Sequence, residues 1–219
     1  MKCPHCSTLL EARQPACHHC GFSLAAMQPF FGDQWVRLDR LTDAAHCLRL
    51  ADRHRAELFL DDFERAFPQV FVAFYFGALP PALNPQEVAF WLLNKGAFST
   101  PQISKRNEYG VTCVIDPAAG TVGTAIGYAL ESLLAEAAPA TIIQAMIPAL
   151  SHAEYGVAIE AATEAVSGLL KPLAAANPIH GTLPGAPQAG STAADYGLHP
   201  LRSGHRPVEK PIPTARSKR

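Results

Sequence analysis

The order of helix-like and strand-like segments predicts an α/β fold, in which a mixed sheet is covered by helices on both faces. A run rich in aromatic and β-branched residues, 69–76, is typical of a buried central strand. Two further strand-like runs, 111–115 and 121–126, are joined by a turn. Helical patterns precede, separate and follow these strands. We therefore expect a three-layer α/β/α sandwich.

Two helices are expected before the first strand, at 44–51 and 55–67, with Thr42 or Asp52 as their caps. Pro68 would end the second helix, because proline cannot continue the backbone hydrogen-bond ladder. The spacing of four apolar residues predicts one buried face for this helix: Leu58, Phe59, Ala66 and Phe67. Its acidic residues Asp61, Asp62 and Glu64 are expected on a solvated face.

The next helix is predicted to begin at Asn84-Pro85, with asparagine as the cap and proline in the first turn. Its buried side would be formed by Val88, Phe90, Trp91, Leu92 and Leu93. Further along, Asp116-Pro117-Ala118-Ala119-Gly120 has the composition of a tight turn, so its flanking strands should form an antiparallel hairpin. Helices at 140–150 and 154–170 would close the domain.

The chain has three zones of different composition. Residues 1–26 contain four of the six cysteines, and residues 33–176 contain the predicted helices and strands. Residues 177–219 contain seven prolines and five glycines with almost no clustered apolar residues, which predicts a disordered tail. We therefore expect a small ribbon, an α/β/α domain and a basic, flexible extension.

The overall composition argues for a folded protein that does not bind nucleic acid generally. Hydrophobic residues make up 48% of the chain, charged residues only 17%, and the net charge is −1. No segment resembles a secretory signal or a membrane span, so we expect a soluble, cytoplasmic protein. The sequence does not indicate an oligomeric state.

The cysteine spacing predicts one metal site near the amino terminus. Cys3-x2-Cys6 and Cys17-x2-Cys20 are separated by ten residues, and each pair directs two sulfurs toward one point. Four thiolates complete the tetrahedron of a structural zinc ion and leave no position open for catalysis. Disulfides are the alternative, but a chain without a secretory signal is expected in a reducing compartment.

Other residues near the thiols leave the ligand assignment open. His5, His18 and His19 can replace a thiol or act from the second coordination shell, although exposed bystanders are the simpler interpretation. Cys47 and Cys113 have no partner pattern and are expected to be buried free thiols. The ribbon itself can bind nucleic acid, contact a protein or hold the amino terminus in place. Because residues 1–26 contain few basic residues, the last two roles are favoured.

Five spaced segments in the second half of the chain form a recognisable series. They are Asn107-Glu108-Tyr109-Gly110-Val111, Ile126-Gly127-Tyr128-Ala129-Leu130-Glu131, Ala140-Thr141-Ile142-Ile143, Met146-Ile147-Pro148 and Glu154-Tyr155-Gly156. In this order they resemble the motifs of the TPM domain family, over roughly residues 38–173. The resemblance implies an α/β/α sandwich. Some members of the family are divalent-cation-binding acid phosphatases, and others are non-enzymatic partners.

The chain departs from the family pattern at several polar positions. The family commonly has Asp-Asn-Gly where this chain has Glu108-Tyr109-Gly110, an acidic residue at Ala125 and an arginine at Thr141. A surviving site for Ca²⁺ or Mg²⁺ would use Glu108 and Glu131, with Tyr128 donating to a bound oxygen. Alternatively, Glu108 is a solvated turn residue, Glu131 a carboxylate at a helix start and Tyr128 a packing residue.

Two functions from different classes follow from these residues. The leading hypothesis is a non-catalytic binding or assembly protein whose partner is another protein, because family core positions remain while acidic positions are replaced. The alternative is a divalent-cation-dependent acid phosphatase that uses Glu108 and Glu131. Nucleic-acid binding through ribbon and tail is a third and weaker hypothesis.

Overall fold

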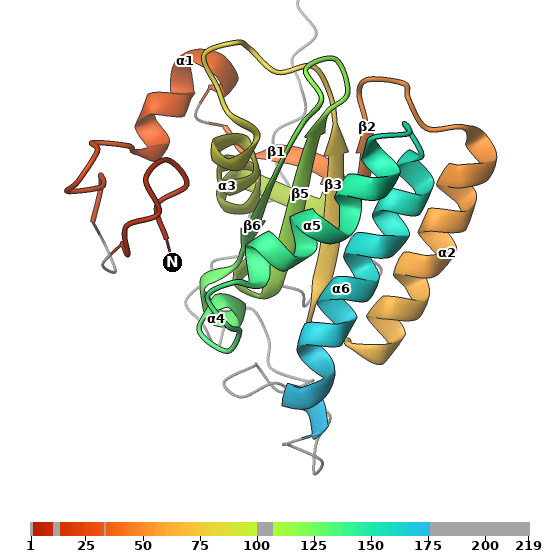
Figure 1. The fold of residues 1–219 in the computed structure, drawn as a ribbon. Helices are drawn as coiled ribbons and strands as arrows, with labels where there is room; N and C mark the ends of the chain where they lie inside the picture. Colours follow the sequence, from red (N-terminus) through yellow and green to blue (C-terminus); the bar gives the residue numbers. More distant parts are fainter. Residues whose placement is uncertain (1, 11–13, 33, 100–106, 176–219) are drawn as a thin grey trace, which may run out of the picture. The chain divides into compact units, whose positions relative to one another are not determined.

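A four-stranded mixed sheet forms the centre of the computed structural model, which describes residues 2–10, 14–32, 34–99 and 107–175 (Figure 1). The described residues lie within one compact unit, Met1–Ala186. The strand order is β2-β3-β5-β6, and the strands are β2 (Leu41–Asp43), β3 (Phe71–Phe76), β5 (Gly110–Asp116) and β6 (Thr121–Ile126). β2, β3 and β5 are parallel, and β6 is antiparallel to β5. The predicted tail, 177–219, lies outside the described residues.

Helices cover both faces of this sheet, so the predicted three-layer α/β/α sandwich is confirmed. Successive residues of β3 point to opposite faces, as strand geometry requires. Val72 and Phe74 pack with α2 (Leu50–Ala66), α5 (Ala138–Leu150) and α6 (Tyr155–Ala175). Phe71 and Ala73 pack with α3 (Pro85–Lys95) on the other face. Both faces of the central strand are therefore buried.

A second, two-stranded sheet was not expected from the sequence. β1 (Val36–Asp39) and β4 (Gly96–Ser99) pair in parallel, and Val36 faces Gly96 in the register. Each strand has four residues, and β2 has only three. Strands this short do not establish a period of two in the sequence, which is why the composition of these segments did not reveal them.

The segment between β2 and β3 contains one helix where the sequence predicted two. α2 starts at Leu50, and residues 44–49 form an irregular turn. The carboxylate of Asp43 accepts hydrogen bonds from the backbone N–H groups of Cys47 and Leu48, and His46 has a φ of +53°. This local side-chain bonding competes with helix formation. Neither predicted cap was correct, because Arg49 is the N-cap and no side chain caps the helix.

The predicted buried face of α2 was only partly correct, because Phe67 packs against the core but Ala66 is exposed. Leu58 is 52% exposed, whereas the buried residues of α2 are Ala56, Leu60, Phe63 and Glu64. Arg40, between β1 and β2, explains the orientation, because its guanidinium hydrogen-bonds to the carboxylates of Glu57, Asp61 and Glu64. Two of the acidic residues expected in solvent, Asp61 and Glu64, therefore pair with Arg40, and a glutamate is buried on this face.

The start of α3 follows the sequence prediction closely. Asn84 accepts a hydrogen bond from the N–H of Glu87, and Glu87 accepts one from the N–H of Asn84, so the two residues form a capping box. The predicted apolar residues of this helix are buried. The side-chain amide of Gln86 also exchanges two hydrogen bonds with the backbone of Thr124, which joins α3 to the edge strand β6.

The predicted hairpin between β5 and β6 is confirmed. Asp116 ends β5, and its carboxylate accepts from the backbone N–H groups of Ala118, Ala119 and Leu79. Burial raises the pKa of Asp116, but these three donors outweigh it and hold the pKa below the usual value. Gly120 has a φ of +65°, the conformation that favours glycine in such a turn.

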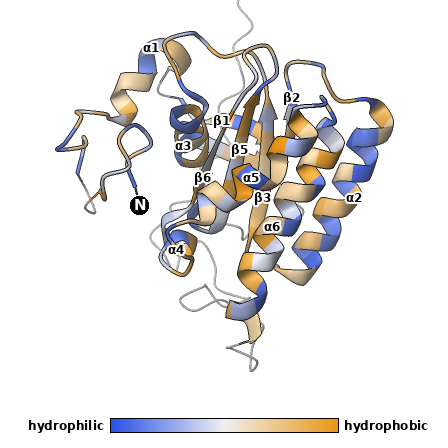
Figure 2. Cartoon of the chain, viewed as in Figure 1, coloured by the Kyte–Doolittle hydropathy of each residue, from blue (hydrophilic) through white to orange (hydrophobic). Residues whose placement is uncertain are grey.

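The remaining described elements are short helices: α1 (Gln28–Phe31), α4 (Tyr128–Glu131) and two 3-10 turns, Leu24–Met27 and Asn107–Tyr109. α5 and α6 agree with the predicted closing helices to within a few residues at each end. Coloured by hydropathy, α2 carries more hydrophilic residues than α5 (Figure 2). No helix in the described part of the chain combines the length and apolar character of a membrane span.

Candidate metal centre

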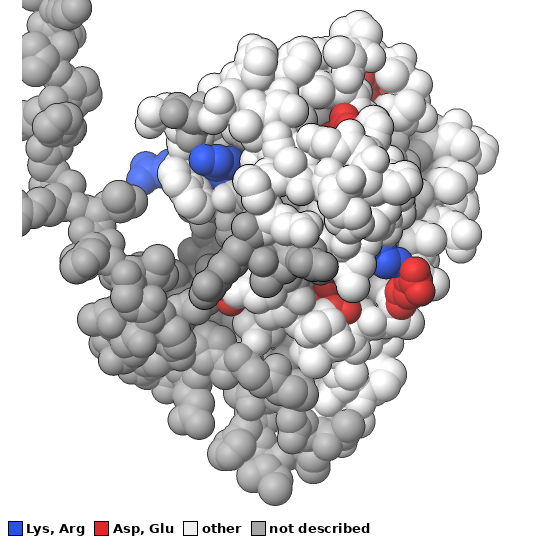
Figure 3. All heavy atoms as spheres, turned by 90° about the vertical axis from the view of Figure 1, so that its left-hand side faces the viewer, with Lys and Arg blue, Asp and Glu red and all other residues white. Residues whose placement is uncertain are grey.

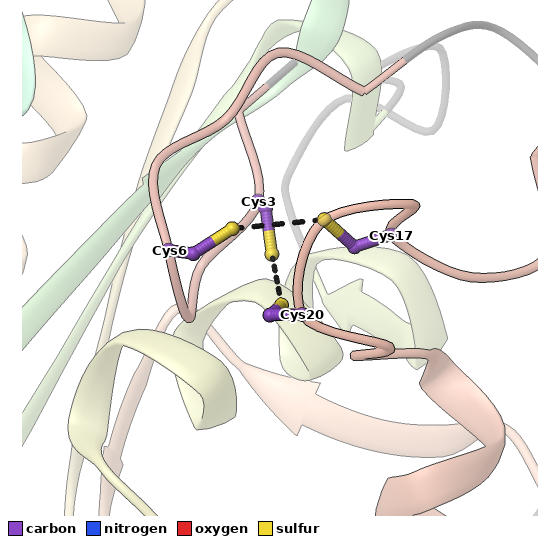
Figure 4. A group of neighbouring side chains, drawn as sticks. All are labelled: Cys3, Cys6, Cys17 and Cys20. Atoms are coloured by element: carbon purple, nitrogen blue, oxygen red, sulfur yellow. Dashed lines mark hydrogen bonds between the residues drawn. The ribbon is translucent and has the colours of Figure 1, made fainter.

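Four cysteine thiols converge near the amino terminus. The sulfurs of Cys3, Cys6, Cys17 and Cys20 all lie within 4.8 Å of one another and point toward a common centre (Figure 4). Cys3 Sγ lies 3.6 Å from Cys20 Sγ, and Cys6 Sγ lies 3.6 Å from Cys17 Sγ. Each of these two pairs joins one Cys-x2-Cys motif to the other.

These distances fit a tetrahedral metal and do not fit disulfides. Four sulfurs at about 2.3 Å from a zinc ion are about 3.8 Å apart. The separations of Cys3 from Cys20 and of Cys6 from Cys17, each 3.6 Å, are close to this value. A disulfide would require the sulfurs to be about 2.05 Å apart, and all six cysteines are free thiols. The four thiols can therefore hold one metal ion.

The two motifs build the same local structure, which explains how the thiols converge. The N–H of Cys3 donates to the carbonyl of Thr8, and the N–H of Cys17 donates to the carbonyl of Phe22. One turn is closed by a hydrogen bond from the N–H of Ser7 to the backbone carbonyl of Cys3. The other turn is closed by a hydrogen bond from the N–H of Gly21 to the backbone carbonyl of Cys17. Ser7 and Gly21 both have positive φ, at 61° and 76°. This conformation favours glycine, and Ser7 takes it without being glycine.

The thiols differ in how readily they ionise. The Thr8 hydroxyl and backbone lower the pKa of Cys6 to about 5. For Cys20, the Phe22 amide lowers the pKa, but desolvation and the three neighbouring thiols outweigh it and raise the pKa to about 12. Desolvation also raises the pKa of Cys3. One thiolate makes the ionisation of a neighbouring thiol unfavourable. A bound cation is therefore needed for four thiolates to coexist.

The histidines near the thiols do not join this group. No histidine nitrogen belongs to the cluster of ligand atoms found among the described residues, and His18 and His19 are exposed. His5 turns instead to α3, where its Nδ1 lies 2.7 Å from Oε1 of Glu87. The interpretation of His18 and His19 as exposed bystanders agrees with the structure. The contact between His5 and Glu87 had no signal in the sequence.

The ribbon packs against the α3 layer. Its apolar residues Leu10 and Phe22 lie against the core that contains Phe90 and Trp91, and the rings of Phe22 and Phe90 are 5.9 Å apart. Met27, just after the ribbon, is 1% exposed in the same core. The ribbon is therefore packed against the hydrophobic core on this face of the sheet.

The residues proposed for a second cation site lie at one end of the sheet. Glu108 lies in the 3-10 turn before β5, and Tyr128 and Glu131 follow β6, which runs the opposite way. The parallel strands begin at this end of the sheet, whereas ligands in α/β folds usually bind at the end where the parallel strands finish. Oε1 of Glu131 accepts the backbone N–H of Lys2 at 3.3 Å. Within the described ranges, only the four cysteines form a group of three or more ligands suited to a metal, so this site stays a prediction.

Cys47 and Cys113 are not activated thiols. Cys113 is buried, and burial raises its pKa to about 12. Cys47 is half-buried, and desolvation together with the Asp43 carboxylate raises its pKa to about 12. Both thiols therefore stay protonated at neutral pH, as expected for cysteines that act as small apolar residues.

Comparisons with known proteins do not assign this chain to a family. No protein-family model and no curated protein matches this chain. Among solved structures, the N-terminal domain of the cg2496 protein from Corynebacterium glutamicum is similar, with 16% identity and a TM-score of 0.46 over 74% of this chain and 86% of that one. The N-terminal domain of a protein from P. gingivalis has 20% identity and a TM-score of 0.45 over 61% of this chain and 82% of that one. The resemblance to TPM domain proteins stays a prediction.

Proposed function

We propose that this chain is a non-catalytic binding or assembly protein of TPM-like fold, in which a structural zinc ion holds the ribbon, 1–26, against the α/β/α domain, 33–176. The observation that carries this proposal is the closed set of four thiols in a ribbon packed into the core of the domain. Four protein ligands leave a zinc ion no open position for a substrate. The metal would therefore stabilise the fold and take no part in a reaction.

The surroundings of the acidic residues favour binding over catalysis. A cation site needs several oxygen ligands that converge on one point. Glu131 instead accepts a hydrogen bond from the backbone of the ribbon, and among the described residues neither Glu108 nor Glu131 belongs to a group of three or more side chains that could hold a metal. Glu131 thus contributes to the attachment of the ribbon.

The charge distribution favours a protein partner over nucleic acid. The face that carries the ribbon shows only scattered Lys and Arg among the side chains that are not grey (Figure 3). Lys2 is paired with the carboxylate of Glu136 at 2.6 Å, which reduces its availability to a phosphate. Nucleic-acid interfaces need a stripe of unpaired basic residues, and the described part of this face lacks that stripe. Free thiols and a zinc ribbon fit a reducing compartment such as the cytoplasm.

Metal analysis and a phosphatase assay test this proposal together. The purified chain should contain zinc in equimolar amount and should not hydrolyse a phosphomonoester with Mg²⁺, Mn²⁺ or Ca²⁺ at acid or neutral pH. Turnover that is lost in Glu131→Ala but retained in the control Glu164→Ala would overturn the proposal in favour of a phosphatase. A chain that binds no zinc, with the four sulfurs oxidised to disulfides, would remove its structural basis.

A further inference from the structure

A cavity of about 480 Å³ lies between the ribbon and the α4–α5 segment. One wall comes from the first cysteine turn, with Lys2, Ser7 and Leu9, and the other wall includes Tyr128, Glu131 and Pro139. The two walls are more than 100 residues apart in the sequence and meet only because the ribbon is packed against the domain. This volume lies within the range of pockets that bind ligands.

The rim of this cavity exposes large apolar side chains. Leu9 is 67% exposed and Tyr128 is 55% exposed. Exposed single apolar residues are common, but here two of them border the same hollow, whose lining is mostly apolar. A ligand that filled only the hollow would leave much of both rim residues in water. An occupant that also covers the rim gains more apolar contact, which favours a polypeptide over a small metabolite.

The charges beside the cavity indicate the character of that polypeptide. Its described lining contains two carboxylates, Glu131 and Glu136, and one ammonium group, Lys2. The Glu136 side chain is 84% exposed even though it pairs with Lys2. An acidic segment would be repelled here, whereas a basic residue beside an apolar one can approach Glu136.

We propose that this cavity, which we name the ribbon pocket, binds a segment of a partner protein that places an apolar side chain in the hollow and a neighbouring Lys or Arg beside Glu136. This inference rests on the proposed function and names the surface through which it would act. Because one wall belongs to the ribbon, binding requires the metal although the metal does not touch the segment.

Selection from a display library of short random peptides on the full-length, zinc-loaded chain tests the ribbon pocket. Selected peptides should contain an apolar residue next to Lys or Arg. In fluorescence anisotropy, Leu9→Asp and Tyr128→Ala should weaken binding of these peptides about tenfold or more, and Glu136→Lys should weaken it less. The control Leu58→Asp changes a similarly exposed leucine on α2 and should leave the affinity unchanged.

The proposal is overturned if no peptide is enriched, if the selected peptides are acidic, or if Leu9→Asp binds them as tightly as the unchanged chain. Zinc content and circular dichroism of each variant show that it is folded. The outcome is separable from the proposed function, since a chain that holds zinc, lacks phosphatase activity and selects no peptide would refute the ribbon pocket alone. Peptide binding that survives zinc removal would refute the requirement for the metal.

Discussion

Nδ1 of His5 lies 2.7 Å from Oε1 of Glu87, and this contact joins the first cysteine turn to the start of α3. Glu87 uses its other oxygen to accept the N–H of Asn84, so one buried carboxylate serves the helix cap and the ribbon together. His5 lies between Cys3 and Cys6 in the sequence. The position of this turn is therefore coupled to the structure of α3.

Glu87→Ala should lower both the stability of the chain and its metal affinity. The helix loses part of its capping box, which costs about 1 kcal/mol, and the loss of the contact to His5 adds about 1 kcal/mol. Because residues that orient the metal ligands commonly affect metal affinity, zinc should bind about tenfold more weakly. Urea unfolding and competition with a chromophoric chelator measure the two effects.

Asn84→Ala separates these two contributions. It removes the cap acceptor of α3 but leaves the contact between His5 and Glu87, so the free energy of unfolding should fall by about 1 kcal/mol while zinc affinity stays unchanged. The exposed control Glu164→Ala should change neither quantity. Equal zinc affinity in Glu87→Ala and the unchanged chain would contradict the coupling.

Loss of the metal should destabilise the whole described unit, because Leu10 and Phe22 of the ribbon pack against the core that contains α3. We expect Cys17→Ser to bind zinc much more weakly and to melt at a lower temperature than the unchanged chain. Chelation of the unchanged chain should lower its melting temperature and increase the fluorescence of a dye that binds exposed apolar surface. Cys47→Ala is the matched control, since that thiol lies outside the cluster. A melting temperature that does not respond to the chelator would show that the ribbon contributes nothing to the fold.

The sequence predicted the features of this fold that depend on neighbouring residues. The asparagine cap at Asn84, the turn after Asp116 and the spacing of the four cysteines each have a local physical cause, so each was visible in the sequence. Features that depend on distant residues were missed. The packing of α2 depends on Arg40, and the ribbon is placed by contacts such as the bond from Lys2 to Glu131, 129 residues away. No local pattern encodes such a pairing.

Asp116 should make the stability of the chain depend on pH below neutrality. Its pKa in the folded state is lowered because three backbone N–H groups outweigh the effect of burial, whereas in the unfolded chain it is about 3.9. A lowered pKa stabilises the fold above the unfolded value, and this contribution is lost as the pH falls through the folded value. Asp116→Asn should therefore reduce the free energy of unfolding by about 1–2 kcal/mol at pH 7, and by less as the pH falls below about 4.

Urea unfolding of Asp116→Asn and the unchanged chain across this pH range measures the difference. Asp39→Asn is the control, because Asp39 is an exposed aspartate on β1 and its replacement should give only a small change. A difference for Asp116→Asn that is the same at pH 3 and pH 7 would show that the charge of Asp116 does not matter.

Gly127 should tolerate no side chain, although its φ is an ordinary −61°. Its N–H donates to the carbonyl of Gly110 at 2.8 Å, and a Cβ at this position would collide with the backbone carbonyl oxygens of Asn107 and Glu108. Backbone atoms cannot rotate away as a flexible side chain can, so we expect Gly127→Ala to destabilise the chain by about 3 kcal/mol. Because Tyr128 and Glu131 follow directly, the variant should also disturb the ribbon pocket and bind selected peptides more weakly.

Gly168→Ala provides the matched control, since a Cβ added at this position of α6 meets no atom within 4 Å. Alanine favours a helix more than glycine does, so this variant should be more stable by about 0.5–1 kcal/mol. Urea unfolding of the two variants side by side distinguishes a steric effect from the general cost of changing glycine. If Gly127→Ala were as stable as Gly168→Ala, the turn before β5 would not lie as close to the start of α4 as the structure shows. The shape of the pocket wall that α4 supplies would then also be wrong.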